Sequence, residues 1–252
     1  MKNQPSGKNT TGNHGDKLPA ETHVLDRYGL PGTSAEHLFD LLNIQHAMFL
    51  ADILDTYSNF GERDPEPFMK YPVPMLTDYI ERSHRHYVSK RLPEIEQSLS
   101  ILLENNHYTH PSLHIICNFF QHYKHELNEH FRMEEKVLLP YANMLYNAFH
   151  NRGGLLVSMV HFNRYSVEDF IQHHHHIDTL FRRVRTSILR YDPPVTNLSP
   201  HRILLNQMKS FEEDLNIHEM IEDQVLVPKL RSMEKRLKNL FETTDGNHFA
   251  NN

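Results

Sequence analysis

Two segments of the chain, residues 130–140 and 218–228, nearly repeat each other. The first reads HFRMEEKVLLP and the second reads HEMIEDQVLVP, so each has a histidine four residues before a glutamate and a shared Val-Leu-x-Pro ending. Residues four apart on a helix lie on one face, one turn apart. The repeat therefore predicts two helices that each direct an imidazole and a carboxylate to the same side, as a transition-metal pair requires.

The hydrophobic pattern predicts helices along most of the chain. Apolar residues recur at helical spacing in ranges 34–60, 75–104, 112–148, 166–190 and 199–241, with a break or kink expected near Pro93. No stretch alternates as a strand does, and the low glycine content (9 residues) and absence of tryptophan argue against a β sandwich or barrel. We expect an all-α fold, an up-down four-helix bundle preceded by an N-terminal helical extension.

Composition suggests the domain limits. Residues 1–20 and 243–252 are polar and are expected to be disordered tails. The extension and a proline-rich loop should occupy 21–72, and the bundle 73–242.

Charge and cysteine content exclude several classes of protein. The net charge is −6 with acids and bases interspersed, so nucleic-acid binding is not expected. No run is long and apolar enough to cross a membrane, and no apolar signal core is seen near the N-terminus. The single cysteine, Cys117, allows neither an internal disulfide nor a cysteine-rich metal site. We expect a cytoplasmic protein.

The other two long helices each offer a single inward-facing histidine. On the first, His84 and His86 lie about 200° apart around the helix, so one of the two can face inward. His84 is favoured because the number of residues from His84 to His174 is close to the number from His130 to His218. Within the run 173–176, His174 is favoured over His173 and His175 because apolar residues of the next turns share its side. The predicted ligands are His84, His130, Glu134, His174, His218 and Glu222.

This donor set suits iron, manganese or zinc. Two ions bridged by two glutamates, with an oxo or hydroxo bridge, would keep about one open position each, enough for a diatomic ligand. An exposed contact between residues four apart is the more common explanation of any one His–Glu pair, but two matched pairs with one ending favour a site. His122, His125 and Glu126 are either surface residues or groups that orient the ligands.

These motifs resemble the hemerythrin-like HHE cation-binding family, and most of all the di-iron Repair of Iron Centers proteins. The resemblance covers about residues 75–230 and implies a hemerythrin-like bundle with two iron ions, manganese or zinc being less expected. It implies a role in nitrosative or oxidative stress, with O2 or NO and damaged iron–sulfur proteins as partners. The chain departs from that family in having no N-terminal paired-cysteine motif, which puts a thiol relay in doubt.

Two other functions remain open on the sequence. The chain is either an O2- or NO-binding or redox-sensing module without catalysis, or an all-α interaction protein whose histidines are incidental. Whether it is an enzyme, and whether it is a monomer or a homodimer, the residues do not decide.

Overall fold

The computed structural model describes residues 19–34, 37–58, 63–104, 111–150, 166–168, 170, 177–191 and 198–248. Every regular element in these ranges is a helix, which confirms the all-α prediction. None of the helices described combines the length and apolar character that crossing a membrane requires.

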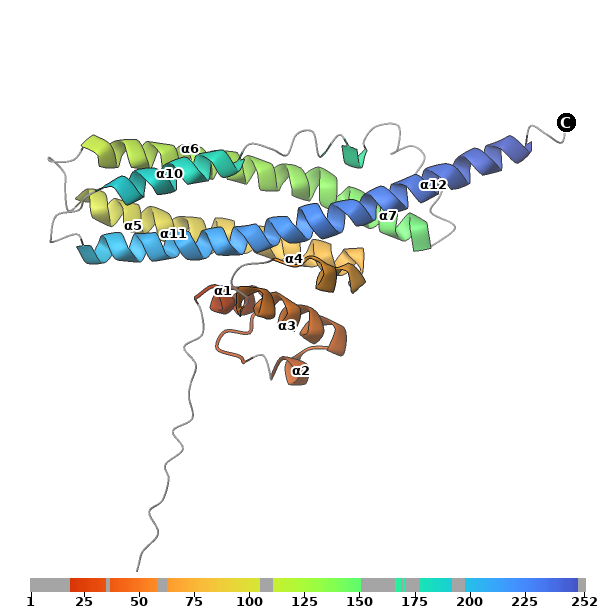
Figure 1. The fold of residues 1–252 in the computed structure, drawn as a ribbon, viewed down its shortest axis with the longest axis horizontal. Helices are drawn as coiled ribbons and strands as arrows, with labels where there is room; N and C mark the ends of the chain where they lie inside the picture. The colour runs from red at the N-terminus through yellow and green to blue at the C-terminus, as the bar shows by residue number, and fades with distance from the viewer. Residues whose placement is uncertain are drawn as a thin grey trace, which may run out of the picture.

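Among the described residues, three long helical segments and one shorter helix form the main body, and Figure 1 draws them along its horizontal axis. Each long segment consists of two α-helices joined by a π-helix. The segments are α4 Val73–His86, η3 Tyr87–Arg91 and α5 Leu92–Glu104; α6 Pro111–Met133, η4 Glu134–Leu138 and α7 Leu139–His150; and α11 Leu198–Glu219, η7 Met220–Leu226 and α12 Val227–His248. The shorter helix is α10 Ile177–Arg190, which packs on α6 and α11, while α5 packs on α6 and α11.

A proline explains each π-helix. The three π-helices end at Arg91, Leu138 and Leu226, in each case two residues before Pro93, Pro140 or Pro228. Proline has no backbone N–H, and its ring clashes with the carbonyl four residues earlier in an α-helix. The wider π turn just before it accommodates this clash without breaking the helix. The shared Val-Leu-x-Pro ending is therefore a signal for a π-helix, and the break predicted near Pro93 is a π-helix in a continuous segment.

The N-terminal extension consists of α1 Pro19–Arg27, α2 Leu38–Leu41, α3 Ile44–Ser58 and the 3-10 helix η2 Glu66–Lys70. The predicted single helix over 34–60 is divided, because the side chain of Asn43 accepts a hydrogen bond from the backbone N–H of His46 (3.0 Å) and so caps the start of α3. Helix α1 contacts α3, α4 and α11 and so joins the extension to the main body.

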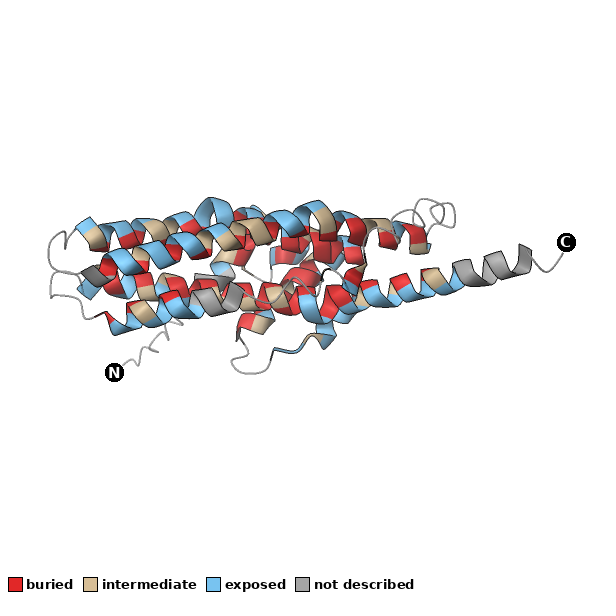
Figure 2. Ribbon diagram, turned by 90° about the horizontal axis from the view of Figure 1, so that it is seen from above, coloured by how far each residue is buried: buried red, intermediate tan, exposed pale blue. Residues whose placement is uncertain are grey.

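Buried residues form two apolar clusters inside the packed helices (Figure 2). One cluster contains residues from α1, α3, α4, α7, η7 and α12. The other contains residues from η3, α5, α6, α10 and α11. Along the three long segments the boundary falls between Ile80 and Tyr87, between Phe131 and Leu138, and between Leu215 and Ile217. The functional side chains described below lie at this boundary.

The ends of the chain differ from the predicted limits. Helix α12 continues to His248, beyond the tail predicted to begin at 243, and extends past the other helices (Figure 1). The predicted helix over 166–190 is described as α10 from Ile177 onward, with helical residues also at 167, 168 and 170. Residues 1–18 and 249–252 of the predicted tails lie outside the described residues.

Candidate metal centre

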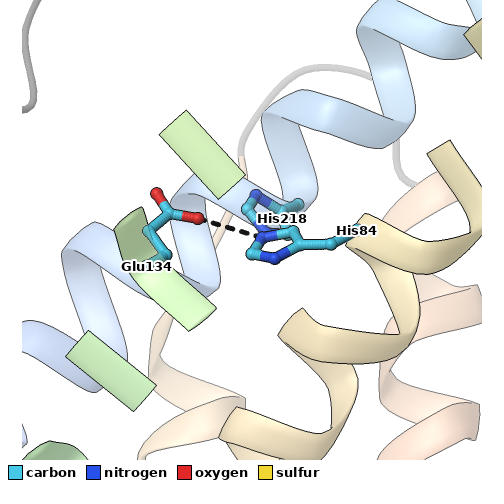
Figure 3. Close-up of side chains that lie close together, drawn as sticks. All are labelled: His84, Glu134 and His218. Atoms are coloured by element: carbon cyan, nitrogen blue, oxygen red, sulfur yellow. Dashed lines mark hydrogen bonds and ion pairs between the residues drawn. The ribbon is translucent and has the colours of Figure 1, made fainter. Parts of the chain in front are cut away.

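Three buried side chains from three helices converge at the boundary between the clusters (Figure 3). They are His84 on α4, Glu134 at the first residue of η4, and His218 near the end of α11. One nitrogen or oxygen atom from each lies within 4.8 Å of the other two. Together they form a group that could hold a metal ion.

The distances suit a common ion. His84 Nε2 lies 2.9 Å from His218 Nε2 and 3.0 Å from Glu134 Oε2. Neighbouring ligands about 2.1 Å from an octahedral metal are about 3.0 Å apart. Two imidazole nitrogens and a carboxylate oxygen, with no sulfur, fit iron, manganese or zinc.

The electrostatics of the cluster favour a cation. Burial lowers the pKa of His84, but hydrogen bonds to Glu134 and Glu135 and the charges of Glu134 and Glu222 outweigh burial and raise this pKa to about 9. Burial, with the charge of His84 next, holds the pKa of His218 well below its ordinary value. His218 is therefore a neutral imidazole, the form that binds metals. The carboxylates that hold a proton on His84 would stabilise a metal ion at the same place.

The Glu134 carboxylate lies between two imidazole groups. Its Oε2 faces His84, while its Oε1 lies 2.6 Å from Nε2 of His130, one turn earlier on α6. Glu222 in η7 is fully buried, and its charge contributes to the raised pKa of His84, so this carboxylate also lies near the cluster. Each oxygen of Glu134 thus faces a different histidine.

Two further side chains fix the orientation of His84. The ring of Phe131 stacks on the His84 ring, with 4.2 Å between centroids and 17° between planes. Glu135, which is partly exposed, lies 3.2 Å from Nδ1 of His84 through Oε1. A carboxylate on one nitrogen fixes the tautomer and directs the other nitrogen's lone pair toward a metal.

The structure brings three of the six predicted ligands into one group, His84, Glu134 and His218, with His130 in contact with Glu134. His84 lies in the cluster, whereas His86 points to α1, where its ring centroid lies 5.5 Å from that of His23. His174, with the rest of the run 173–176, lies outside the described residues. His122 and His125 are exposed, and the partly exposed Glu126 lies 3.9 Å from His122, so all three are surface residues.

Sequence reasoning missed a buried ion pair next to the cluster. Arg27 at the end of α1 donates to Asp214 and, through its other terminal nitrogen, to Ser83 Oγ at 2.8 Å. Tyr57 on α3 donates to the second Asp214 oxygen at 2.6 Å. Ser83 precedes His84, and Asp214 lies one turn before His218, so the pair joins the extension to both histidine helices. The sequence signal for this pair is an acidic residue, Asp214, four residues before the predicted ligand His218 and therefore on the same face of the helix.

No protein-family model matches the chain, and no curated protein or solved structure was found to be significantly similar to it. The resemblance to hemerythrin-like proteins therefore depends on the motifs alone.

Proposed function

We propose that this chain is a non-haem di-iron protein built on a hemerythrin-like four-helix bundle and acting in the response to nitrosative or oxidative stress. The observation that carries the proposal is the buried cluster of His84, Glu134 and His218. Ionisable side chains in an apolar interior are costly unless they are paired or bind a metal. Three of them, from three helices and at ligand distances, favour a metal site over a structural polar contact.

The position of Glu134 supports a second ion. One carboxylate oxygen faces His84 and the other faces His130, so His130 would bind the second ion beside Glu222. The sixth proposed ligand is His174, as the sequence predicts. The arrangement of α5, α6, α10 and α11, each packed against two of the others, supports the bundle.

The surroundings of the cluster limit what it could do. An iron pair with an open coordination position would supply binding of a diatomic molecule such as O2 or NO. Phe131 and the buried ring of Tyr87 keep bulk water from the histidines, and Glu135 holds the orientation of His84. A buried site of this kind selects small ligands.

A thiol relay has no support in this chain. Cys117 is half-buried beside the second apolar cluster, and burial raises the pKa of its thiol. It lies 13 residues before His130 on α6, which is about 20 Å along a helix. Any redox chemistry would therefore be confined to the metals, and repair of damaged iron–sulfur clusters would proceed without a cysteine of this chain near the ions.

The second candidate function is O2 or NO binding, or redox sensing, without catalysis. Burial of the cluster favours it, because Phe131 stacks on His84 and Tyr87 lies against His218, which suits a small ligand better than a large substrate. Reversible O2 binding by the reduced protein would support this function. Reactivation of a damaged iron–sulfur protein in vitro would support repair.

Metal analysis with optical spectroscopy tests the proposal. We expect about two irons per purified chain, and a loss of at least one in Glu134→Ala and in His218→Ala. The matched control is the double variant His122→Ala with Glu126→Ala, which removes an exposed pair of the same spacing from the same helix and should leave the iron content unchanged. Less than one tightly bound metal per chain, or equal losses in control and site variants, would refute it.

A further inference from the structure

A second potential binding site lies on the other side of α4 from the metal cluster. A pocket of about 250 Å³ opens where the end of α1 meets α4 and η3. Its lining residues are basic or uncharged hydrogen-bonding residues: Arg27, Arg82, Arg85, His86 and Ser89. No carboxylate is among the lining residues in the described part of the chain. It is smaller than the cavities that hold drug-sized ligands.

The arginines of the pocket have donors to spare. Arg85 forms no ion pair with any residue that the structure describes. Arg82 uses Nε on Asp78 at 2.8 Å, and one terminal nitrogen reaches the backbone oxygen of Arg27 at 3.5 Å. A guanidinium carries five N–H donors, so most of those on Arg82 and Arg85 are available to a ligand.

Two buried nitrogen atoms at the pocket wall also lack a hydrogen-bond partner. Nε2 of His86, a residue 8% exposed, and Nε of Arg27 have no hydrogen-bond partner within the described part of the chain. A buried donor without an acceptor costs about 1–3 kcal/mol. A ligand that supplies acceptor oxygens would remove this cost.

We infer that this pocket binds a phosphate group, either inorganic phosphate or the phosphate of a small monoester. Arg27 of α1 and the residues of the α4–η3 segment line the pocket together, and their several donors suit a tetrahedral oxyanion with several acceptor oxygens. Arginine favours phosphate because its planar fork donates two parallel hydrogen bonds. The Ser89 hydroxyl already donates to the backbone oxygen of Arg85, so the arginines supply the free donors. A planar carboxylate offers fewer acceptors and would leave more of these donors unused.

This site is separate from the metal centre, and the inference does not rest on the proposed function. The pocket and the cluster nevertheless share a structural connection. Arg27 lines the pocket and donates to Ser83, the residue before His84. An anion bound there would contact the residue that joins α1 to the metal helix.

Calorimetric titration of the full-length protein with inorganic phosphate at low ionic strength tests the inference. We expect binding with a Kd of roughly 1 mM or tighter, and at least a roughly tenfold weakening in Arg85→Ala, which removes charge-assisted hydrogen bonds. Arg183→Ala is the matched control, because Arg183 is exposed on α10 and its loss changes the net charge equally. The control should bind phosphate like the unaltered protein.

Further measurements distinguish the alternatives. Glycerol 3-phosphate, titrated in parallel, should bind more tightly than phosphate if the natural ligand is a monoester and less tightly if it is the free ion. Phosphate held by the metals would be released with them in Glu134→Ala and would be indifferent to Arg85. No binding at 10-fold above the expected Kd, or equal weakening by the Arg85 and Arg183 substitutions, would overturn the inference.

Discussion

Removal of the Asp214 carboxylate should strongly destabilise the fold. In the native protein this carboxylate accepts hydrogen bonds from Arg27 and from Tyr57, and the ion-paired side chains are fully buried. Asp214→Ala leaves the guanidinium of Arg27 buried without a counter-charge and Tyr57 without an acceptor. Breaking a buried pair from one side costs about 3–5 kcal/mol. The free energy of unfolding should fall by about this amount.

Urea denaturation followed by circular dichroism measures the loss, provided that the slope of the transition is unchanged. The matched control is Glu212→Ala. Glu212 lies on the same helix as Asp214 and forms a partly exposed ion pair with Arg185 of α10. That pair should contribute at most about 1 kcal/mol. A loss from Asp214→Ala no larger than the loss from Glu212→Ala would refute the reasoning.

A double substitution separates the charge from the contact. Arg27→Met together with Asp214→Leu removes both charges and keeps apolar volume at the two positions. Because no buried charge is then left uncompensated, the double variant should be more stable than Asp214→Ala alone. If it is as unstable as the two single variants added together, the uncompensated charge is not the cause.

Three further predictions follow from single side chains. Glu135→Ala should weaken metal binding about 10–100-fold in competition with a chelator while the circular dichroism stays unchanged, because the orientation of His84 would be lost. Burial lowers the pKa of His23 to about 4, so the unfolded chain takes up protons more readily than the fold between about pH 6.5 and pH 4. Stability should therefore fall as the pH is lowered from about 6.5 to about 4. The fall should be less steep in His23→Phe when the melting temperatures of the two proteins are compared. Hydrogen bonds from Lys124 and Gln121 hold the pKa of Glu96 below its ordinary value, so this contact stabilises the fold above that value and is lost in more acidic solution. Lys124→Met should lower the melting temperature at pH 7 and have a smaller effect at pH 3; an equal effect at both would contradict the assignment.

The sequence predicts the long helices well because their apolar spacing persists over many turns. It also identifies Glu134 and His218, since a repeated pattern of histidine, glutamate and proline is rare by chance. The choice between His84 and His86 is less certain from sequence, because both lie on one helix. The choice depends on which face of that helix packs inward. The structure places His84 in the cluster, where it meets His218, and turns His86 toward α1.

Other features depend on contacts that a local pattern does not contain. Helix α1 has 9 residues, too few for a clear period, and its position is set by the pairing of Arg27 with Asp214, far away in the sequence. The π-helices follow from proline chemistry, yet Pro93 alone predicts a kink as readily as a wider turn. The equal distance from η3, η4 and η7 to the following proline becomes visible in the structure.

The division of the apolar interior has a consequence for how the molecule unfolds. His84, Glu134 and His218 form a polar layer where the two buried clusters meet, and a bound ion would tie three helices together across it. Without an ion, we expect the halves to be coupled less tightly, because polar side chains occupy this level. Amide hydrogen exchange should then show two separately opening units in the metal-free chain and one cooperative unit in the loaded chain. The same residues that would bind the metal thus set the cooperativity of the whole fold.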